Sequence, residues 1–561
     1  MTVNETAAAT NPSYDETEDA VPVEAQAQTN EGVARATGIL AAGNIASRVL
    51  GLAREIVVAN LFGAGRATDA FNVALVVPKS LYDLLIAGHV NSAIIPVLSE
   101  IVTVKGKDEL WRLVSILISI VVVALSVLVL VLEFFSPAVI GLISSAEPQT
   151  LELATLLLRL TAPALIFMSL FAVLSGTLYA LRVFTWSAFA GAVFNGSIVA
   201  VVLLFVLPMR SGGQHPPDSA IQFAAAGWLV GAIAQLILQY PGLRGAKIRI
   251  SFNWRHPAVR QIAMLYLPVM FSLVLDTLIN RFFSYRLAIQ SGEGGISYMN
   301  LATTLIQFPQ GLVATAISIA ILPTLARQAA IVLGEVGEQS QLAFKNTLGL
   351  GLRLATTLII PAAVALFVLA TPIIHLLFQH GEFTPGDTVS TALALRLYLI
   401  GLPFAALDLL LVYAFYARQD TLTPALIGLL SLAVYMVVAV TLQPKYGLFS
   451  LMIADSVKHM THASVSGYLL HRRLKGFNEQ RLLLTFAKTG LAALAMGVAV
   501  VLAEPIIENA FGLASLSGEV LVVGISGGIC LAVFITLALI LKIEELQWMA
   551  SLIRRRLTGK G

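Results

Sequence analysis

Ionisable side chains interrupt several long apolar segments of this sequence. A charged group inside a membrane helix costs at least ~2.5–3.5 kcal/mol, so each one indicates a partner, a polar cavity or a transport pathway. The residues that stand out are Arg48, Arg54 and Glu55 in residues 36–62, Asp69 and Lys79 in residues 67–100, and Asp276, Asn280 and Arg281 in residues 258–289. Two interpretations of this set stay open, and they differ in what neutralises the arginines.

In the first interpretation, these residues form ion pairs that hold helices in register. Arg48 and Glu55 are seven residues apart and share a helix face, so they can pair, and Lys79 and Asp83 have i,i+4 spacing. Arg54 points about 120° away from Arg48, at about 100° per residue. Glu55 is therefore poorly placed to neutralise both arginines.

In the second interpretation, the arginines line a water-filled cavity and bind an anion. A guanidinium is permanently charged and presents a planar fork of donors, which suits a diphosphate. Arg48, Arg54 and Arg281 are the strongest candidates for such a site. The acids that would orient them or respond to a coupling ion are Glu55, Asp69 and Asp276.

The composition places these residues in a membrane protein. The 561 residues are 57% hydrophobic and only 12% charged, with a mean hydropathy of +0.85, whereas soluble proteins carry roughly 25% charged residues. The single cysteine, Cys530, excludes an internal disulfide and a cysteine-based metal cluster. Nucleophile elbows, Walker loops and dinucleotide fingerprints are absent. We therefore expect no enzyme activity, no cofactor and no bound metal.

Apolar segments separated by short polar ones predict an all-α polytopic membrane protein with about fourteen transmembrane helices. Their approximate limits are 36–62, 67–100, 110–142, 150–181, 185–208, 219–241, 258–289, 296–326, 342–370, 388–416, 422–442, 447–470, 482–503 and 519–541. Lys and Arg concentrate in alternate loops and in the C-terminal tail, and these residues stay in the cytoplasm during insertion. The sequence therefore predicts a multi-pass protein with both termini in the cytoplasm.

A weak internal repeat has an offset of 237 residues. LYALRVFTWSA (178–188) resembles FYARQDTLTPA (415–425), and at the same offset Arg159 matches Arg396. Chance similarity between leucine-rich helices is the alternative, but the repeat favours two pseudosymmetric six-helix lobes around a central cavity. The predicted organisation is a disordered acidic tail in 1–33, an N-lobe in 34–245, a C-lobe in 246–475, a helix pair in 476–545 and a basic cytoplasmic tail in 546–561.

SRVLGLAREIVVANLFGAGRATDAF (47–71) closely resembles the first-helix signature of the MurJ (MviN) family, the lipid II flippases of the wider MATE-like (MOP) exporter superfamily. Four further blocks resemble that family in the same order. They are AIIPVLSE (93–100), FPQGLVATAISIAILPTLAR (308–327), LFQHGEFTPGDT (377–388) and FYARQDTLTPA (415–425). The likeness covers most of the chain after residue 36.

The resemblance implies fourteen helices, with the last pair beside a hydrophobic groove for a polyprenyl tail. In the family, a central cationic cavity takes a pyrophosphate–sugar–peptide headgroup, and alternating access carries it across the bacterial inner membrane. The expected function is thus transfer of lipid II, the undecaprenyl-diphosphate-linked peptidoglycan precursor, from the cytoplasmic to the periplasmic leaflet. The residues that match functional positions of the family are Ser47, Arg48, Arg54 and Asp69.

Some positions that are usually charged in the family are neutral here. They are Tyr82, Ala87, Thr303, Thr304 and Gln307, and Asn280 stands where some members carry an ion-binding aspartate. Lys79 and Arg281 are candidate replacements for the lost charges. Two alternatives follow, namely a non-transporting scaffold or regulator of cell-wall synthesis, and an exporter of a different lipid-linked glycan. The expected partners are lipid II or a related polyprenyl-diphosphate lipid, membrane lipids and cell-wall synthesis enzymes, with no nucleic acid.

Overall fold

The computed structural model describes residues 23–83, 94–144, 147–210, 216–264, 279–333 and 337–547, and the regular elements within these ranges are all helices. Those of the first half are α1 (Val23–Phe62), α2 (Arg66–Tyr82), α3 (Ile95–Val104), α4 (Lys107–Ile143), α5 (Pro148–Thr161), α6 (Ala164–Ala180), α7 (Thr185–Ala188), α8 (Ala190–Phe205), η3 (Leu207–Arg210), η4 (Asp218–Ile221), α9 (Gln222–Ile237) and η5 (Tyr240–Leu243).

The second half contains longer helices. They are α11 (Arg281–Ile289), α12 (Gly295–Pro309), the π-helical segment η7 (Gln310–Ala314), α13 (Thr315–Leu333), α14 (Gly337–Val368), α15 (Ala370–Phe378), α16 (Pro385–Ala417), α17 (Leu422–Tyr446), α18 (Phe449–Arg473), η8 (Asn478–Gln480), α19 (Leu482–Phe511) and α20 (Leu516–Ile540).

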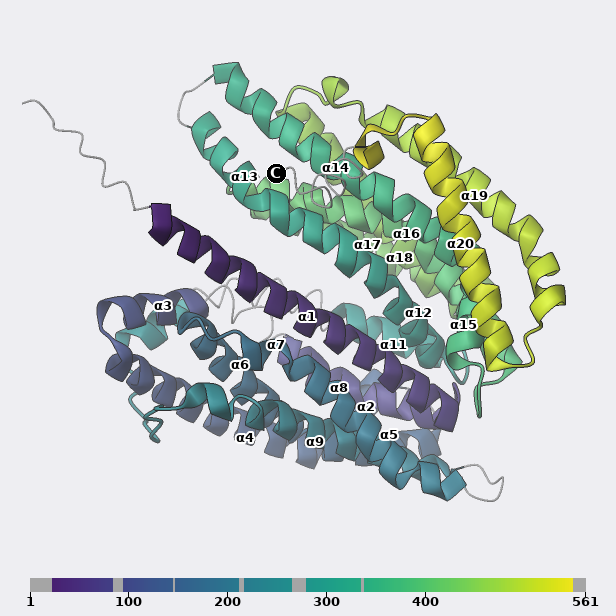
Figure 1. Ribbon diagram of the computed structural model, residues 1–561. Coiled ribbons are helices and arrows are strands. Elements are labelled where there is room, and N and C mark those ends of the chain that lie inside the picture. Colours follow the sequence, from purple (N-terminus) through teal and green to yellow (C-terminus); the bar gives the residue numbers. More distant parts are fainter. Residues whose placement is uncertain are drawn as a thin grey trace, which may run out of the picture.

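Two helical bundles and a separate C-terminal pair make up the molecule (Figure 1). In the first bundle α8 packs against α1 and α9, and α2 packs against α5; in the second, α16 packs against α14 and α18. Helices α19 and α20 pack against each other, and α19 lies along α14. Figure 1 shows α1 running along the boundary between the bundles. The predicted all-α fold with two lobes and a C-terminal pair is confirmed.

Ten helical stretches of the described residues are long and apolar enough to cross a membrane. They coincide with ten of the fourteen predicted segments. The other four fall on α1, on α2 with α3, on α18, and on residues 258–289, which the structure describes only in part. These four segments contain most of the charges that the sequence places at membrane depth, and charge lowers hydropathy. Charged side chains therefore explain why these four segments fall below the hydropathy of the other ten.

The start of α1 differs from the prediction. Residues 1–33 are predicted to be a disordered tail, but α1 begins at Val23 and includes residues 23–33. This stretch, VEAQAQTNEGV, is rich in Ala, Gln and Glu, which have high helix propensity. The remainder of the predicted tail lies outside the described residues.

The internal repeat has a structural counterpart at the ends of α6 and α16. Arg182 and Gln419, 237 residues apart, both adopt a left-handed backbone with φ of 60° and 59°. Around Arg182, backbone hydrogen bonds join residues 182 to 179 and 183 to 178, with lengths of 3.0 and 2.8 Å. The same two bonds join 419 to 416 and 420 to 415, with lengths of 2.9 and 3.0 Å. This double bond is the Schellman ending of a helix, and its repetition supports the pseudosymmetry of the lobes.

The arginines of the repeat also make equivalent contacts. Arg159 donates to Ser136 Oγ at 2.8 Å, which joins α5 to α4. Arg396 donates to the Phe367 carbonyl at 3.1 Å and to Thr371 Oγ1 at 3.0 Å, which joins α16 to α14 and α15. Both arginines therefore bind the preceding helix of their own lobe. These contacts are hydrogen bonds between neighbouring helices, not the ion pairs of the first interpretation.

Candidate functional site

A cavity of about 480 Å³ lies between the two bundles, with walls formed by α1, α2, α8, α9, α11 and α12. Six of the nine predicted site residues line it: Ser47, Arg48, Arg54, Glu55, Lys79 and Arg281. Asp69 and Asn280 are described but are not part of the wall, and Asp276 lies outside the described residues. The structure thus brings together residues that are more than 200 positions apart in the sequence.

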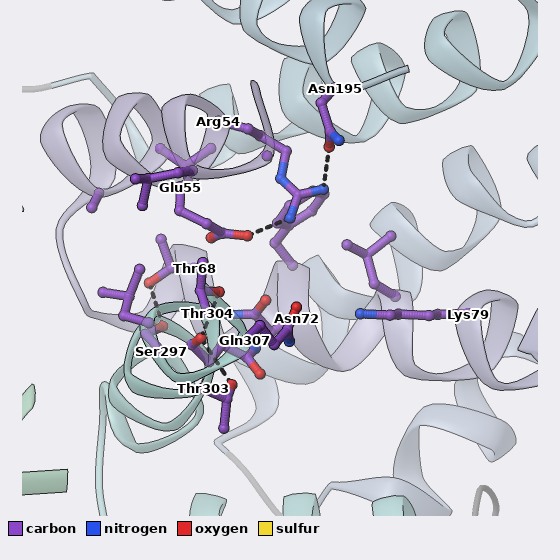
Figure 2. A pocket seen from close by; sticks show the side chains of 18 of the residues that line it. Arg54, Glu55, Thr68, Asn72, Lys79, Asn195, Ser297, Thr303, Thr304 and Gln307 are labelled. Carbon is purple, nitrogen blue, oxygen red and sulfur yellow. Dashed lines mark hydrogen bonds and ion pairs between the residues drawn. The ribbon is translucent and has the colours of Figure 1, made fainter. Parts of the chain in front are cut away.

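Arg54 is held by three neighbours at one side of the cavity. It forms an ion pair with Glu55, and its Nη1 donates to Asn195 Oδ1 at 3.0 Å (Figure 2). The Trp228 ring lies 5.8 Å from the guanidinium carbon, within cation–π range. Glu55 therefore pairs with Arg54, and the predicted pairing of Glu55 with Arg48 is wrong, because Arg48 turns toward the opposite lobe.

Asn195 and Trp228 are site residues that sequence reasoning missed. Asn195 Nδ2 donates to the carbonyls of Gly191 at 3.0 Å and Ser47 at 3.3 Å, so its amide oxygen is fixed toward Arg54. Trp228 is braced edge-to-face by Phe194, with ring centroids 4.8 Å apart. The sequence does contain a signal for Asn195, because it is the only amide in the apolar run 190–206. A polar side chain within a membrane segment needs a partner.

Arg48 makes its contact across the cavity. Its Nη1 donates to the backbone carbonyl of Gln307 at 2.9 Å, at the end of α12. Among the described residues no carboxylate lies within ion-pairing distance of this guanidinium. Its positive charge is therefore not neutralised by a described acid.

Arg281 and Lys79 extend the cationic wall. Arg281 pairs with Asp83 at 2.7 Å and donates to Ser80 Oγ at 3.3 Å, which joins α11 to α2. The predicted pairing of Lys79 with Asp83 is wrong, since Arg281 takes that carboxylate. Within the described part of the chain, the Lys79 ammonium has no hydrogen-bond or ion-pair partner, and Figure 2 shows it pointing toward the space between the helices.

The wall formed by α12 is neutral. Its cavity-lining polar residues are Ser297, Asn300, Thr303, Thr304 and Gln307. Figure 2 shows the last three lying together opposite Arg54. The Thr303 and Thr304 hydroxyls donate to the Asn300 carbonyl at 3.0 and 2.9 Å. Their protons are thus used within the helix, and the oxygen lone pairs remain as acceptors. Such a wall suits hydroxyl and amide groups better than it suits an ion.

The charges on the cavity wall do not balance. Among the described lining residues, four cationic side chains face the single carboxylate of Glu55, which leaves three net positive charges. Including Asp83, the partner of Arg281, leaves two. In a medium of low dielectric constant such an excess attracts an anion strongly. No group of three or more His, Cys, Asp and Glu side chains is placed to hold a metal ion in the part of the chain that the structure describes.

Asp69 joins the two lobes at one end of the cavity. Its buried carboxylate accepts bonds from the backbone N–H groups of Gly294 at 2.7 Å and Ser297 at 3.1 Å, and from Ser297 Oγ at 2.8 Å. These groups form the N-terminus of α12, where the helix dipole favours negative charge. Nearby, Glu382 N–H donates to the Asn60 carbonyl at 2.9 Å. The lobes are therefore in contact at this end.

Comparison with known proteins gives one family. A family model described as "Lipid II flippase MurJ" matches residues 58–522. The "Probable lipid II flippase MurJ" of Haemophilus influenzae is 31% identical over 477 residues, which is 81% of this chain and 89% of that protein. The "Lipid II flippase MurJ" of Burkholderia cenocepacia is 33% identical over 392 residues, 68% of this chain and 73% of its own length.

Solved structures share the fold. A structure described as "Lipid II flippase MurJ, inward closed conformation" superposes with a TM-score of 0.72 at 22% identity, covering 89% of this chain and 98% of that one. An inward-facing multidrug resistance MATE transporter of the MOP superfamily superposes with a TM-score of 0.62 at 16% identity, covering 77% and 96%. The sequence matches span most of the chain, and this integral membrane protein therefore belongs to the MurJ family of lipid II flippases.

Proposed function

We propose that this protein transfers lipid II, the undecaprenyl-diphosphate-linked peptidoglycan precursor, from the cytoplasmic to the periplasmic leaflet of the bacterial inner membrane. Transfer occurs by alternating access and involves no covalent chemistry, so the protein acts as a transporter and not as an enzyme. The observation that carries the proposal is the net positive charge of the cavity, which the acids of the described chain do not neutralise.

The diphosphate is the part of the substrate that this charge recognises. Arg54 is held in place by Glu55, Asn195 and Trp228, so it loses little side-chain entropy when it binds. The Lys79 ammonium has no partner in the part of the chain that the structure describes, and Arg48 and Arg281 offer guanidinium forks that match phosphate oxygens. The neutral α12 wall then faces the sugar and peptide groups beyond the diphosphate. Ser47, on α1 with Arg48 and Arg54, lines the cavity as a further hydrogen-bonding group.

We place both termini in the cytoplasm, following the distribution of Lys and Arg. The end of α1 at Asn60 then faces the periplasm, and the contacts of Asp69 with α12 and of Asn60 with Glu382 close that side. Outward opening requires these contacts to break while the lobes rock. A substrate drives such a change only by binding the two states differently. The lobe limits at residues 245 and 475, a coupling role for Asn280 or Asp276, and docking of cell-wall enzymes on the tails stay predictions.

Complementation tests the proposal. The chain is expressed in a strain depleted of its own lipid II flippase, and lipid II at the outer leaflet is measured with a probe that cannot cross the membrane. The wild type should restore growth and outer-leaflet lipid II, and Arg48→Ala at equal expression should not. Arg286→Ala is the matched control, because Arg286 lies outside the cavity wall and its one hydrogen bond to a described residue is to the Leu142 carbonyl at 3.4 Å. Failure of the wild type to restore outer-leaflet lipid II, at normal membrane levels, contradicts the proposal.

A second candidate is an exporter of a different lipid-linked glycan. The neutral α12 wall, with Thr303, Thr304 and Gln307 at positions usually charged in the family, favours it. Competition in the same strain separates the two candidates. A wild type that binds polyprenyl-diphosphate glycans lacking the peptide as tightly as lipid II supports the second candidate, and a clear preference for the peptide-bearing lipid supports the first.

A further inference from the structure

The contact between Arg48 and the opposite lobe depends on a glycine. A Cβ built on Gly311 would lie 2.3 Å from Arg48 Nη2, 2.6 Å from Cζ and 2.9 Å from Nη1, all closer than real side-chain contacts. The guanidinium therefore occupies the space left by the missing side chain of Gly311 while it donates to the Gln307 carbonyl at 2.9 Å. Gly311 and Gln307 both belong to the second lobe, and Arg48 to α1 of the first.

The backbone at this point departs from regular α-helix. Pro309 has no N–H to donate, and the next five residues, Gln310–Ala314, form a π-helix. Single-turn π-helices interrupt the regular pattern of backbone bonding and are frequent at functional sites. At this interruption the Gln307 carbonyl accepts from the Gln310 N–H of its own helix. The second lone pair of the same oxygen accepts from Arg48 of the other lobe.

The contact with Gln307 uses a small part of the hydrogen-bonding capacity of Arg48. A guanidinium has five N–H donors, and the contact with Gln307 occupies one of them. Arg48 Nε is buried and has no hydrogen-bond partner among the described residues. A buried donor without a partner is destabilising, so the seated guanidinium is stabilised only in part. A diphosphate, which accepts several charge-assisted bonds at once, is a stronger partner.

We propose that Gly311 and the Gln307 carbonyl form a seat for the Arg48 guanidinium, and that a polyprenyl diphosphate takes the guanidinium from this seat when it binds. The inference rests on the proposed function and adds the step that links recognition to movement. Binding breaks a contact between α1 and the second lobe, so the substrate itself loosens the lobes. Without bound substrate, the protein keeps the contact between Arg48 and Gln307, and the two lobes stay together at this point.

The variant Gly311→Ala tests the seat without changing any charge, because the new methyl group fills the space that the guanidinium occupies. The apparent Kd equals the intrinsic Kd divided by the fraction of molecules whose Arg48 is free to bind. Gly311→Ala raises this fraction and should therefore tighten binding. With undecaprenyl diphosphate as the probe, in neutral lipid nanodiscs, we expect about tenfold tighter binding, equivalent to about 1.4 kcal/mol. Transport of the full substrate should fall, because the closed empty state is weakened.

Two controls identify the cause. Gly490→Ala, in α19, places a methyl group where nothing lies within 4 Å and should leave the affinity unchanged. In an Arg48→Ala background, Gly311→Ala should have no further effect, since non-additivity marks residues that act through one another. The proposal is contradicted if Gly311→Ala binds the diphosphate as tightly as the wild type or more weakly. It is also contradicted if Gly311→Ala changes the affinity equally in the Arg48→Ala background.

A measurement with Gly311 intact covers the case in which Gly311→Ala does not fold. Spin labels at Ile45→Cys on α1 and Leu312→Cys on η7, both exposed, are introduced with Cys530→Ala, which removes the only cysteine. Undecaprenyl diphosphate should lengthen the distance between the labels, and a neutral polyprenol should not. An unchanged distance at saturating diphosphate overturns the seat. If Arg48→Ala binds the diphosphate as well as the wild type, the proposed function of the cavity fails as well.

Discussion

The two lobes share an architecture but contribute different chemistry to the cavity. The first lobe supplies Arg48, Arg54 and Lys79, whereas α12 of the second supplies neutral amides and hydroxyls. The second lobe's own cation in the wall, Arg281, is paired with Asp83 of the first. The lobes nevertheless end α6 and α16 with the same pair of backbone bonds. Pseudosymmetry thus determines where helices lie, and residues outside the repeat determine what the cavity binds.

The largest difference between the two walls is expected when a charge is removed from one and a hydroxyl from the other. Arg54→Ala should reduce binding and transport of the diphosphate lipid about 10- to 100-fold, since a charge-assisted hydrogen bond is worth about 1.5–3 kcal/mol. Thr304→Ala, whose proton is already used by the Asn300 carbonyl, should cost less than about fivefold, the worth of about 1 kcal/mol. Equal losses from the two variants, measured by lipid binding at equal folded yield, would show that the walls do not differ.

The second largest effect is expected at the contact that Asp69 makes between the lobes. Asp69→Asn keeps the size of the side chain but replaces an acceptor oxygen and removes the charge that faces the N-terminus of α12. We expect the closed end to open more often by about tenfold, or about 1.4 kcal/mol. Labelling of a cysteine introduced near Asn60 by an impermeant reagent from the periplasm measures this. Ser297→Ala, which loses one bond to the same carboxylate, should have a smaller effect in the same direction.

A polar turn at the end of α16 distinguishes the second lobe from its repeat. Asp420 accepts bonds from Thr423 N–H at 2.9 Å and Thr423 Oγ1 at 2.6 Å and pairs with Arg473, whereas the residue 237 positions earlier is Val183. Burial alone would raise the pKa of Asp420, but the bonds from Thr423 and Arg473 outweigh it and lower the pKa from 3.8 to about 2.

Because the pKa is lower in the folded state, the carboxylate stabilises the protein fully above about pH 4 and loses this contribution as the pH falls toward 2. Asp420→Asn should therefore lower the unfolding free energy at pH 7 by about 1 kcal/mol, a value reduced by solvent screening of the partly exposed pair. The difference from the wild type should be mostly lost by pH 2 in thermal unfolding, because the folded-state carboxylate is then about half protonated. Asp108→Asn, which removes an exposed pair with Lys247, should change stability much less. A difference as large at pH 2 as at pH 7 would contradict this assignment.

The smallest effect concerns the shared turn itself. Gln419→Gly should stabilise the protein by roughly 0.5–1 kcal/mol, because a left-handed backbone costs a non-glycine residue about 1–2 kcal/mol and glycine almost nothing. Arg182→Gly should gain less, since it also removes a cation from a helix C-terminus, where the dipole favours positive charge. Opposite signs for these two variants in the same unfolding assay would show that the two turns are not equivalent.

The sequence predicts the helical fold and the charged residues of the cavity wall, because apolar length and charges within apolar segments are local signals. Arg48, Arg54, Lys79 and Arg281 were found this way. Pairing was predicted less well, since Glu55 binds Arg54 and Asp83 binds Arg281. Partners on one helix can be inferred from its periodicity, but Asn195, Trp228 and the Gln307 carbonyl reach the site from elements far along the chain. Such contacts depend on how the lobes pack, and the residue spacing within one segment carries no information about that packing.

In this account the cations of the first lobe, which outnumber the carboxylates beside them, hold the diphosphate of the substrate. A structure of the protein bound to lipid II in a nanodisc tests it most directly. We predict that phosphate oxygens lie within hydrogen-bond distance of Arg48, Arg54 and Lys79, with Arg48 released from Gln307. Diphosphate density elsewhere in the molecule, with Arg48 still bound to Gln307 and no anion beside Lys79, would contradict the account.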